Sequence, residues 1–215
     1  FVESDNMAAQ TGTVEVTVNL ASISEAKVTV SGGPFTYDGK PKTPTVTVEL
    51  NGKPLSGGTD YKLSYENSNG GADNLTNAGM VTVTATGKGN YTGTKTATFT
   101  IAQSATEFDG GVTVDKQDKT YTYGDTITVT VTPKSTGVAP ANNALVLAAP
   151  TAGQMAIYEG DRQLTEAKDV TSGSELTFTI DTAEVNLGRG KHTLTAKFVE
   201  SDNMAAQTGT VEVTV

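Results

Sequence analysis

Apolar and polar residues alternate over short stretches along most of the chain, and these stretches end at Gly, Pro, Asn or Asp. A period of two is the pattern of a β-strand with one buried face, and the breaker residues mark turns. The first half contains five alternating stretches: residues 26–31, 44–50, 61–66, 80–86 and 96–101. The second half contains seven: residues 111–116, 126–132, 144–148, 154–159, 175–181, 192–198 and 208–215. The pattern therefore predicts an all-β protein.

The segments between the predicted strands have the chemistry of tight turns. Gly, Asn and Asp in adjacent positions accept positive φ or cap themselves. Examples are Asp38-Gly39, Asn51-Gly52, Gly124-Asp125 and Gly160-Asp161. We expect a linker at residues 103–107 and a single helical turn at residues 182–187.

A perfect internal repeat defines the organisation of the chain. Residues 1–18, FVESDNMAAQTGTVEVTV, recur without a change as residues 198–215, so the second copy starts 197 residues after the first. Self-similarity at a fixed period is typical of tandem arrays, and this period is long enough to hold whole domains. An engineered duplication would give the same identity. The array interpretation predicts neighbouring repeats of the same chain as partners.

Two resemblances to known families cover most of the chain. FTYDGKPKTPTVTV, GTDYKLSY, NAG and GKGNYTGTKTATFTI follow in order from Phe35 to Ile101 and resemble the YDG-type repeats of bacterial surface proteins, relatives of the mucin-binding glycoprotein domains. YTYGDTITVTV, AIYEGDRQL and LGRGKHTLTAKF resemble the group-3 bacterial Ig-like domain. The resemblances imply stalks, adhesins and secreted multidomain proteins. They identify no ligand.

We therefore predict two Ig-like β-sandwich domains in tandem, in an elongated arrangement. Residues 19–103 form the YDG-type domain, and residues 104–215 form the group-3 Ig-like domain. Residues 1–18 are the C-terminal strand segment of the preceding repeat's Ig-like domain.

The duplicated segment suggests a way for molecules to associate. Its valines share one face of a strand in both copies, because side chains alternate with a period of two. An orphan strand has an unpaired edge and can replace its twin in a neighbouring molecule. We expect head-to-tail strand exchange through six residues: Val14, Val16, Val18, Val211, Val213 and Val215.

Composition and charge exclude several classes of protein. The chain has no Cys, so disulfides, thiolate metal sites and cysteine nucleophiles are excluded. The net charge is -9, and residues 104–215 carry fifteen acidic against eight basic residues. Such a surface repels nucleic acid and anionic lipid. The longest apolar run, residues 144–150, is too short to span a bilayer, so we expect targeting and anchoring signals outside these residues.

Candidates for catalysis are few. His192 is the only imidazole and stands on a predicted strand beside Arg189 and Lys191, where an exposed polar role is expected. No nucleophile elbow, phosphate loop or paired-His motif is present. The remaining candidates are carboxylates on predicted turns: Asp60, Asp125, Glu159 and Asp161. We predict no enzyme activity and no cofactor.

The sequence also contains residues that could bind a metal ion or a sugar or form a cross-link, and each of them has an ordinary structural explanation. Calcium is the metal left open, at residues 66–77 and 200–203, although neither loop has EF-hand spacing. The predicted last strands contain no Asn for a Lys–Asn isopeptide bond. Four tyrosines of the first domain could in principle bind a sugar, but we expect them to pack against other side chains: Tyr37, Tyr61, Tyr65 and Tyr91.

Together these features predict a stalk or fibre segment of an extracellular, adhesin-like bacterial protein. The alternative is an adhesin module that binds a host or environmental glycan or protein. An accessory domain of an enzyme is a third class.

Overall fold

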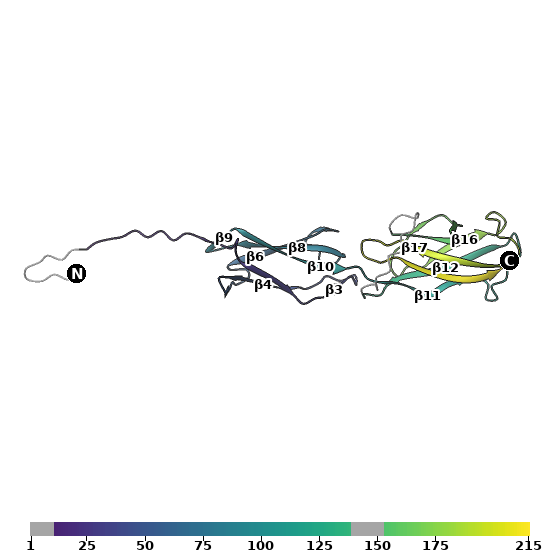
Figure 1. Cartoon of the computed structure of the whole chain (residues 1–215), viewed down its shortest axis with the longest axis horizontal. Helices are drawn as coiled ribbons and strands as arrows, with labels where there is room; N and C mark the ends of the chain where they lie inside the picture. The colour runs from purple at the N-terminus through teal and green to yellow at the C-terminus, as the bar shows by residue number, and fades with distance from the viewer. Residues whose placement is uncertain (1–10, 139–152) are drawn as a thin grey trace, which may run out of the picture.

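The computed structural model describes residues 11–138 and 153–215, so the strand predicted at residues 144–148 lies outside the described residues. The protein is all-β, as predicted, and the described residues contain no helix that could cross a membrane. Two groups of strands lie end to end along the longest axis of the molecule (Figure 1). Residues 11–20 extend away from both groups and belong to no strand.

The first group of strands, called here the N-terminal unit, covers residues 21–102. Its main sheet has the order β3-β10-β8-β6-β7, a second sheet has the order β2-β4-β5, and β1 pairs with β9. The strands are β1 (Ala21–Ser22), β2 (Lys27–Ser31), β3 (Phe35–Thr36), β4 (Thr45–Leu50), β5 (Lys53–Pro54), β6 (Tyr61–Asn67), β7 (Gly71–Ala72), β8 (Gly79–Gly87), β9 (Tyr91–Thr92) and β10 (Thr94–Ala102).

Strand β8 shows why this sequence folds as a sheet. Val81, Val83 and Ala85 are fully buried, and the threonines between them are half-buried. This is the period-two pattern of a strand with one face in the core. Ile23 and Tyr61 are buried together with Ala85 in the small core of this unit.

The second group, the C-terminal unit, covers residues 106–214. One sheet has the order β11-β12-β16 and the other has the order β14-β13-β17-β18, with β15 also paired to β13. The strands are β11 (Thr106–Val114), β12 (Thr126–Ser135), β13 (Gln154–Glu159), β14 (Arg162–Gln163), β15 (Lys168–Asp169), β16 (Leu176–Asp181), β17 (Lys191–Phe198) and β18 (Gln207–Thr214).

The inward faces of these two sheets form one hydrophobic core. It contains alternate residues of β12, β16, β13, β17 and β18. Phe178 and Phe198 are its largest fully buried side chains. Burial of a side chain of this size contributes about 1.5–3 kcal/mol, so this core is the main source of stability in the C-terminal unit.

Two local predictions need correction. The linker expected at residues 103–107 is not free chain, because β11 starts at Thr106 and pairs with β12. Strand β11 also starts earlier than expected at residue 111, because Gly110 and Gly111 form a bulge within the strand, with φ of 75° and 77°. The glycine pair bends the strand without ending it.

The turn expected at residues 182–187 is present as hydrogen-bonded turns. Val185 donates its backbone N–H to Asp181, and Leu187 donates to Thr182. The side chain of Asp181 accepts hydrogen bonds from the N–H groups of Ala183 and Glu184 and so caps this turn.

Candidate functional site: the terminal strand and the unit junction

Strand β18 closes the C-terminal unit and is identical in sequence to residues 11–18 over Thr208–Val215. It pairs antiparallel with β17 over eight residue pairs, from Lys191 with Thr214 to Phe198 with Gln207. Val211 and Val213 are 5% and 2% exposed and lie in the core. The strand is therefore held both by a backbone ladder and by apolar burial.

The outer part of β18 also packs against β11 of the opposite sheet. A Cβ atom placed on Gly209 would lie 2.7 Å from Phe108 Cδ2 and 2.9 Å from Val112 Cγ2. Only glycine fits this contact without displacement of its neighbours. The contact brings the first and last strands of the unit together.

Near the N-terminal unit, the start of the C-terminal unit is hydrogen-bonded to the segment that leads into β18. Ser104 N donates to Asn203 O at 3.0 Å, and Ala205 N donates to Ser104 O at 2.9 Å. Thr106 Oγ1 donates to Ala205 O at 2.6 Å. The bridge between Ser104 and Met204 is parallel, so the two segments run in the same direction.

A second parallel bridge holds the other end of β18. Tyr121 N donates to Thr214 O at 2.8 Å, and Thr214 N donates to Lys119 O at 2.9 Å. Two segments of the unit are thus hydrogen-bonded near its last strand: residues 104–106 bond to the chain just before β18, and residues 119–121 bond to the C-terminal end of β18. Tension applied where the chain enters and leaves the unit acts along both pairs of parallel segments, so it loads these contacts in shear.

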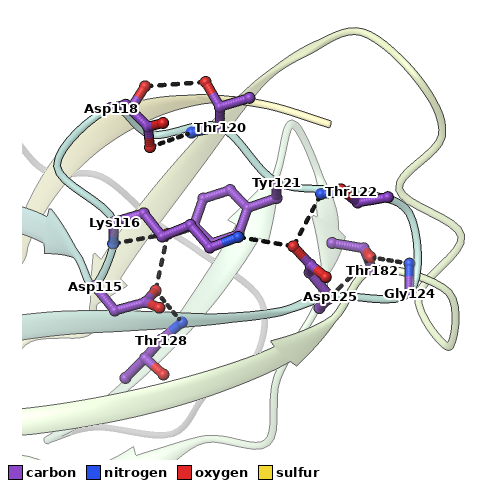
Figure 2. A network of polar contacts seen from close by, with 10 residues as sticks. All are labelled: Asp115, Lys116, Asp118, Thr120, Tyr121, Thr122, Gly124, Asp125, Thr128 and Thr182. Carbon is purple, nitrogen blue, oxygen red and sulfur yellow. Dashed lines mark hydrogen bonds and ion pairs between the residues drawn. The ribbon is translucent and has the colours of Figure 1, made fainter.

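Polar contacts fix the segment that carries the second bridge (Figure 2). Asp115 Oδ1 accepts hydrogen bonds from Tyr121 Oη at 2.8 Å and from Thr128 N at 2.9 Å. Desolvation by neighbouring groups opposes ionisation of Asp115, but these hydrogen bonds outweigh it and lower its pKa. Burial and the hydrogen bond to Asp115 raise the pKa of Tyr121 to about 12. The phenol therefore stays neutral and donates to a charged acceptor.

An ion pair completes this network. Lys116 Nζ lies 2.7 Å from Asp125 Oδ2 and 4.6 Å from the centre of the Tyr121 ring. Their hydrogen bond raises the pKa of Lys116 and lowers that of Asp125. Both side chains are partly exposed, at 42% and 38%, so this is a solvent-screened surface ion pair. Thr182 Oγ1 donates to Asp125 O at 2.9 Å and ties the loop to the adjacent turn.

The loop between β17 and β18 also contacts the N-terminal unit. Asn203 Oδ1 accepts a hydrogen bond from Ala78 N at 2.8 Å, and Asn203 Nδ2 lies 3.4 Å from Asn77 Oδ1. Gln103 Nε2 donates to Ser201 O at 2.7 Å. The same loop therefore joins β18, the chain that connects the units, and the end of the N-terminal unit.

The two loops considered for calcium, residues 66–77 and 200–203, meet at this junction through Asn77 and Asn203. Amide groups make the contacts there. Asn77 Nδ2 donates to Asn69 O at 2.8 Å, and Asn67 Nδ2 donates to Asn77 O at 2.9 Å. Within residues 11–138 and 153–215, no group of three or more Asp, Glu or His side chains could hold a metal ion.

A groove of about 460 Å³ lies beside the junction. Tyr37, Asp38 and Gly39 line it on the N-terminal unit. Residues 134–137 and 172–173 line it on the C-terminal unit. In this groove a tyrosine of the predicted cluster, Tyr37, lines the same surface as polar groups of the second unit. Tyr61 is buried in the core, and Tyr91 packs against that core.

The structure corrects the prediction for His192. Its side chain is only 14% exposed, with Nδ1 at 2.6 Å from Glu159 Oε1 and Nε2 at 2.7 Å from Gly188 O. Glu159 also binds Arg162 at 2.7 Å. The hydrogen bond from His192 is the largest cause of the lowered pKa of Glu159. Both ring nitrogens are occupied by structural partners, so the imidazole is not presented to a substrate.

The exchange valines fall into two groups. Val14, Val16 and Val18 are 85%, 77% and 89% exposed, whereas Val211 and Val213 are buried and Val215 packs against the core. Whether the two copies exchange stays a prediction. Sequence reasoning missed the junction residues Gln103 and Asn203, because polar residues in loops show no period that indicates a distant partner.

Comparison with known proteins assigns no family to the chain. No protein-family model and no curated protein matches it, so the YDG-type and group-3 Ig-like resemblances stay predictions. One similar solved structure is the adhesin InvE of Yersinia pseudotuberculosis, at 19% identity and a TM-score of 0.44, covering 87% of this chain and 59% of that chain. Another is domains 4 and 5 of the S-layer protein SbsC, at 20% identity and a TM-score of 0.29, covering 90% of this chain and 97% of that chain. At these values neither similarity assigns a function.

Proposed function

We propose that the chain is a tension-resistant spacer in an extracellular, adhesin-like bacterial protein built from repeats of 197 residues. The observation that carries this proposal is the parallel hydrogen bonding of residues 104–106 to the chain that leads into β18 and of residues 119–121 to the end of β18. This arrangement loads many contacts at once when the ends are pulled. A spacer that joins a binding domain to a cell surface needs that property.

Two further features support a spacer. The units lie end to end, so each repeat adds length (Figure 1). The hydrogen bonds of Gln103 and Asn203 tie the units together. Placement outside the cell rests on the resemblance of the sequence to bacterial surface repeats, and a chain without cysteine is compatible with it.

Small-angle scattering with mass determination tests the spacer proposal. We expect an elongated monomer for the full chain and for a chain that lacks residues 1–18. A compact particle in both cases would contradict the proposal, because two units folded back on each other do not lengthen the molecule.

The groove beside Tyr37 favours a second candidate function, an adhesin module that binds a glycan. An aromatic ring together with hydroxyl and charged groups is a common arrangement for sugar recognition, and Tyr37 lies opposite Lys134 and Ser135. Glycan-array binding by the wild type that is lost in Tyr37→Ala, with Tyr123→Ala as a control on an exposed tyrosine elsewhere, would support it. Absence of binding by the wild type would leave the spacer function alone.

A further inference from the structure

Residues 11–18 have an identical copy elsewhere in the chain. They match Thr208–Val215 at every position, and the structure places the two copies in opposite environments. The valines of one copy are exposed, and those of the other are buried or packed against the core. We propose that residues 11–18 bind a second copy of this chain by taking the place of β18.

The site for such a strand is fully defined by the contacts of β18. Strand β17 offers backbone partners from Lys191 to Phe198. The core accepts valines at the positions of Val211 and Val213. An incoming strand with the same spacing, Val14 and Val16, restores the ladder and the apolar burial together.

Two finer contacts also select this sequence. The packing of β18 against Phe108 and Val112 admits only glycine at position 209, and Gly12 stands at the matching position of the donor. Thr214 exchanges backbone hydrogen bonds with Lys119 and Tyr121, and Thr17 would make them in its place. An unrelated strand with the same apolar pattern but a bulky residue at the glycine position would clash.

The resulting assembly would resemble the covalent array. Only Asn19 and Leu20 separate the donor segment from β1 of its own N-terminal unit. A donor strand seated in a neighbour therefore places the next N-terminal unit directly after that neighbour's C-terminal unit. Repeated association is head to tail and open-ended, because donor and acceptor lie at opposite ends of each molecule (Figure 1).

Competition within the chain determines when exchange occurs. A tethered strand acts at an effective concentration of millimolar order, so at about 10 µM chain β18 outcompetes a neighbour's strand by about 100-fold. Exchange therefore requires that β18 be detached or defective. In an array, a copy of this segment is the last strand of its own unit, so a strand from a neighbouring chain could fill an open slot only after it had itself been detached.

The full-length variant Val211→Asp/Val213→Asp tests the proposal. Buried unpaired carboxylates expel the tethered strand from the core, while Val14 and Val16 of the donor remain intact. We expect this variant to form oligomers that grow with concentration in sedimentation velocity, whereas the wild type stays monomeric at about 10 µM.

The control carries two more changes, Val14→Asp and Val16→Asp. These side chains are exposed, so the changes do not affect either unit, but they remove the donor. We expect the fourfold variant to be monomeric with an unfolded C-terminal unit. A synthetic peptide of residues 1–18 should refold that unit in the fourfold variant, which would be seen as the return of a cooperative thermal unfolding transition. The same peptide should break up the oligomers of the double variant.

Two results would overturn the proposal. One is a Val211→Asp/Val213→Asp chain that stays monomeric at every concentration, whether its C-terminal unit folds or not. The other is oligomers that persist in the fourfold variant or ignore the peptide. Neither result affects the spacer function, which depends on the shape and strength of the wild-type monomer.

Discussion

The side-chain oxygen of Asn203 accepts a hydrogen bond from the backbone N–H of Ala78 at 2.8 Å, across the boundary between the two units. Ala78 is 1% exposed, so its N–H group has no access to water. The loss of a partner for a buried donor costs about 1–3 kcal/mol. This one contact therefore limits how far the units can bend at their junction.

The variant Asn203→Ala should loosen the junction. Because the chain has no native cysteine, spin labels can be attached at Lys62→Cys and Glu175→Cys alone. We expect a broader distribution of the distance between the labels, since the buried N–H is satisfied by water only when the units separate. The control is Asp202→Ala, a change to an exposed neighbour in the same loop. An unchanged distribution in Asn203→Ala would show that this contact does not hold the junction.

The two copies of the repeat provide an internal control for packing of the last strand. Gly209→Ala should destabilise the C-terminal unit by about 1–3 kcal/mol, because its new methyl group meets Phe108 and Val112. Gly12→Ala makes the same change in the same local sequence, where nothing lies within 4 Å. Thermal unfolding should show a lower midpoint for the first variant only. Equal midpoints would mean that β18 does not pack against β11 as described.

Hydrophobic periodicity predicted most of the strands, because β-strands with one buried face repeat that pattern directly. Residues 154–159 were predicted with the same bounds as β13. The glycines at 110 and 111 misled the prediction of β11, since a bulge and a turn use the same residue type. Strand β3, which has two residues, pairs in parallel with the distant end of β10, and so short a segment has no period.

The candidate site was less predictable than the fold. The duplicated strand was visible in the sequence, but the bonds of Ser104 to the chain before it and of Tyr121 to its end were not. Backbone hydrogen bonds between segments about 100 residues apart depend on the assembled sandwich and not on side-chain type. The hydrogen bond between Tyr121 and Asp115 was likewise not predictable, because a separation of six residues is common in turns and does not indicate a side-chain contact.

Tyr121 should make the protein sensitive to alkali. Its pKa is raised from 10.0 to about 12 in the folded protein, first by burial and then by the hydrogen bond to Asp115. Because the pKa of Tyr121 is higher in the folded state, its neutral phenol contributes fully to stability below about pH 10, and this contribution is lost as the pH rises toward 12. Tyr121→Phe should be less stable at pH 7 and should lose less stability between pH 10 and 12.

Tyr123→Phe is the control for this change, because Tyr123 lies in the same loop and is 54% exposed. Chemical denaturation at pH 7, 10 and 11.5 measures the effect. An alkaline loss in Tyr121→Phe as large as in the wild type would contradict the role assigned to the phenol.

Glu159 should contribute to the loss of folding stability at low pH. Its pKa is lowered below 4.5, mainly by the hydrogen bond from His192 and with support from Arg162. A carboxyl group whose pKa is lower in the folded state than in the unfolded state stabilises the protein at pH values above its unfolded-state pKa. This stabilisation is lost as the pH falls through the folded-state pKa. Glu159→Gln should be less stable by about 1 kcal/mol at pH 6, because a partly exposed ion pair is screened by water. Its stability should also fall less steeply below pH 4.5 than that of the wild type, whereas Glu166→Gln should follow the wild type.

Single-molecule pulling in two directions tests the tension-resistant role of the C-terminal unit most directly. Handles at the two chain ends shear the bonds that join Ser104 to the chain before β18 and Tyr121 to the end of β18. Handles at Lys191→Cys and Val215 instead peel β18 from β17 one pair at a time, since Lys191 pairs with Thr214 at the open end of the hairpin. We predict a much higher unfolding force for the C-terminal unit when it is pulled from the chain ends. Equal forces in the two directions would contradict the account.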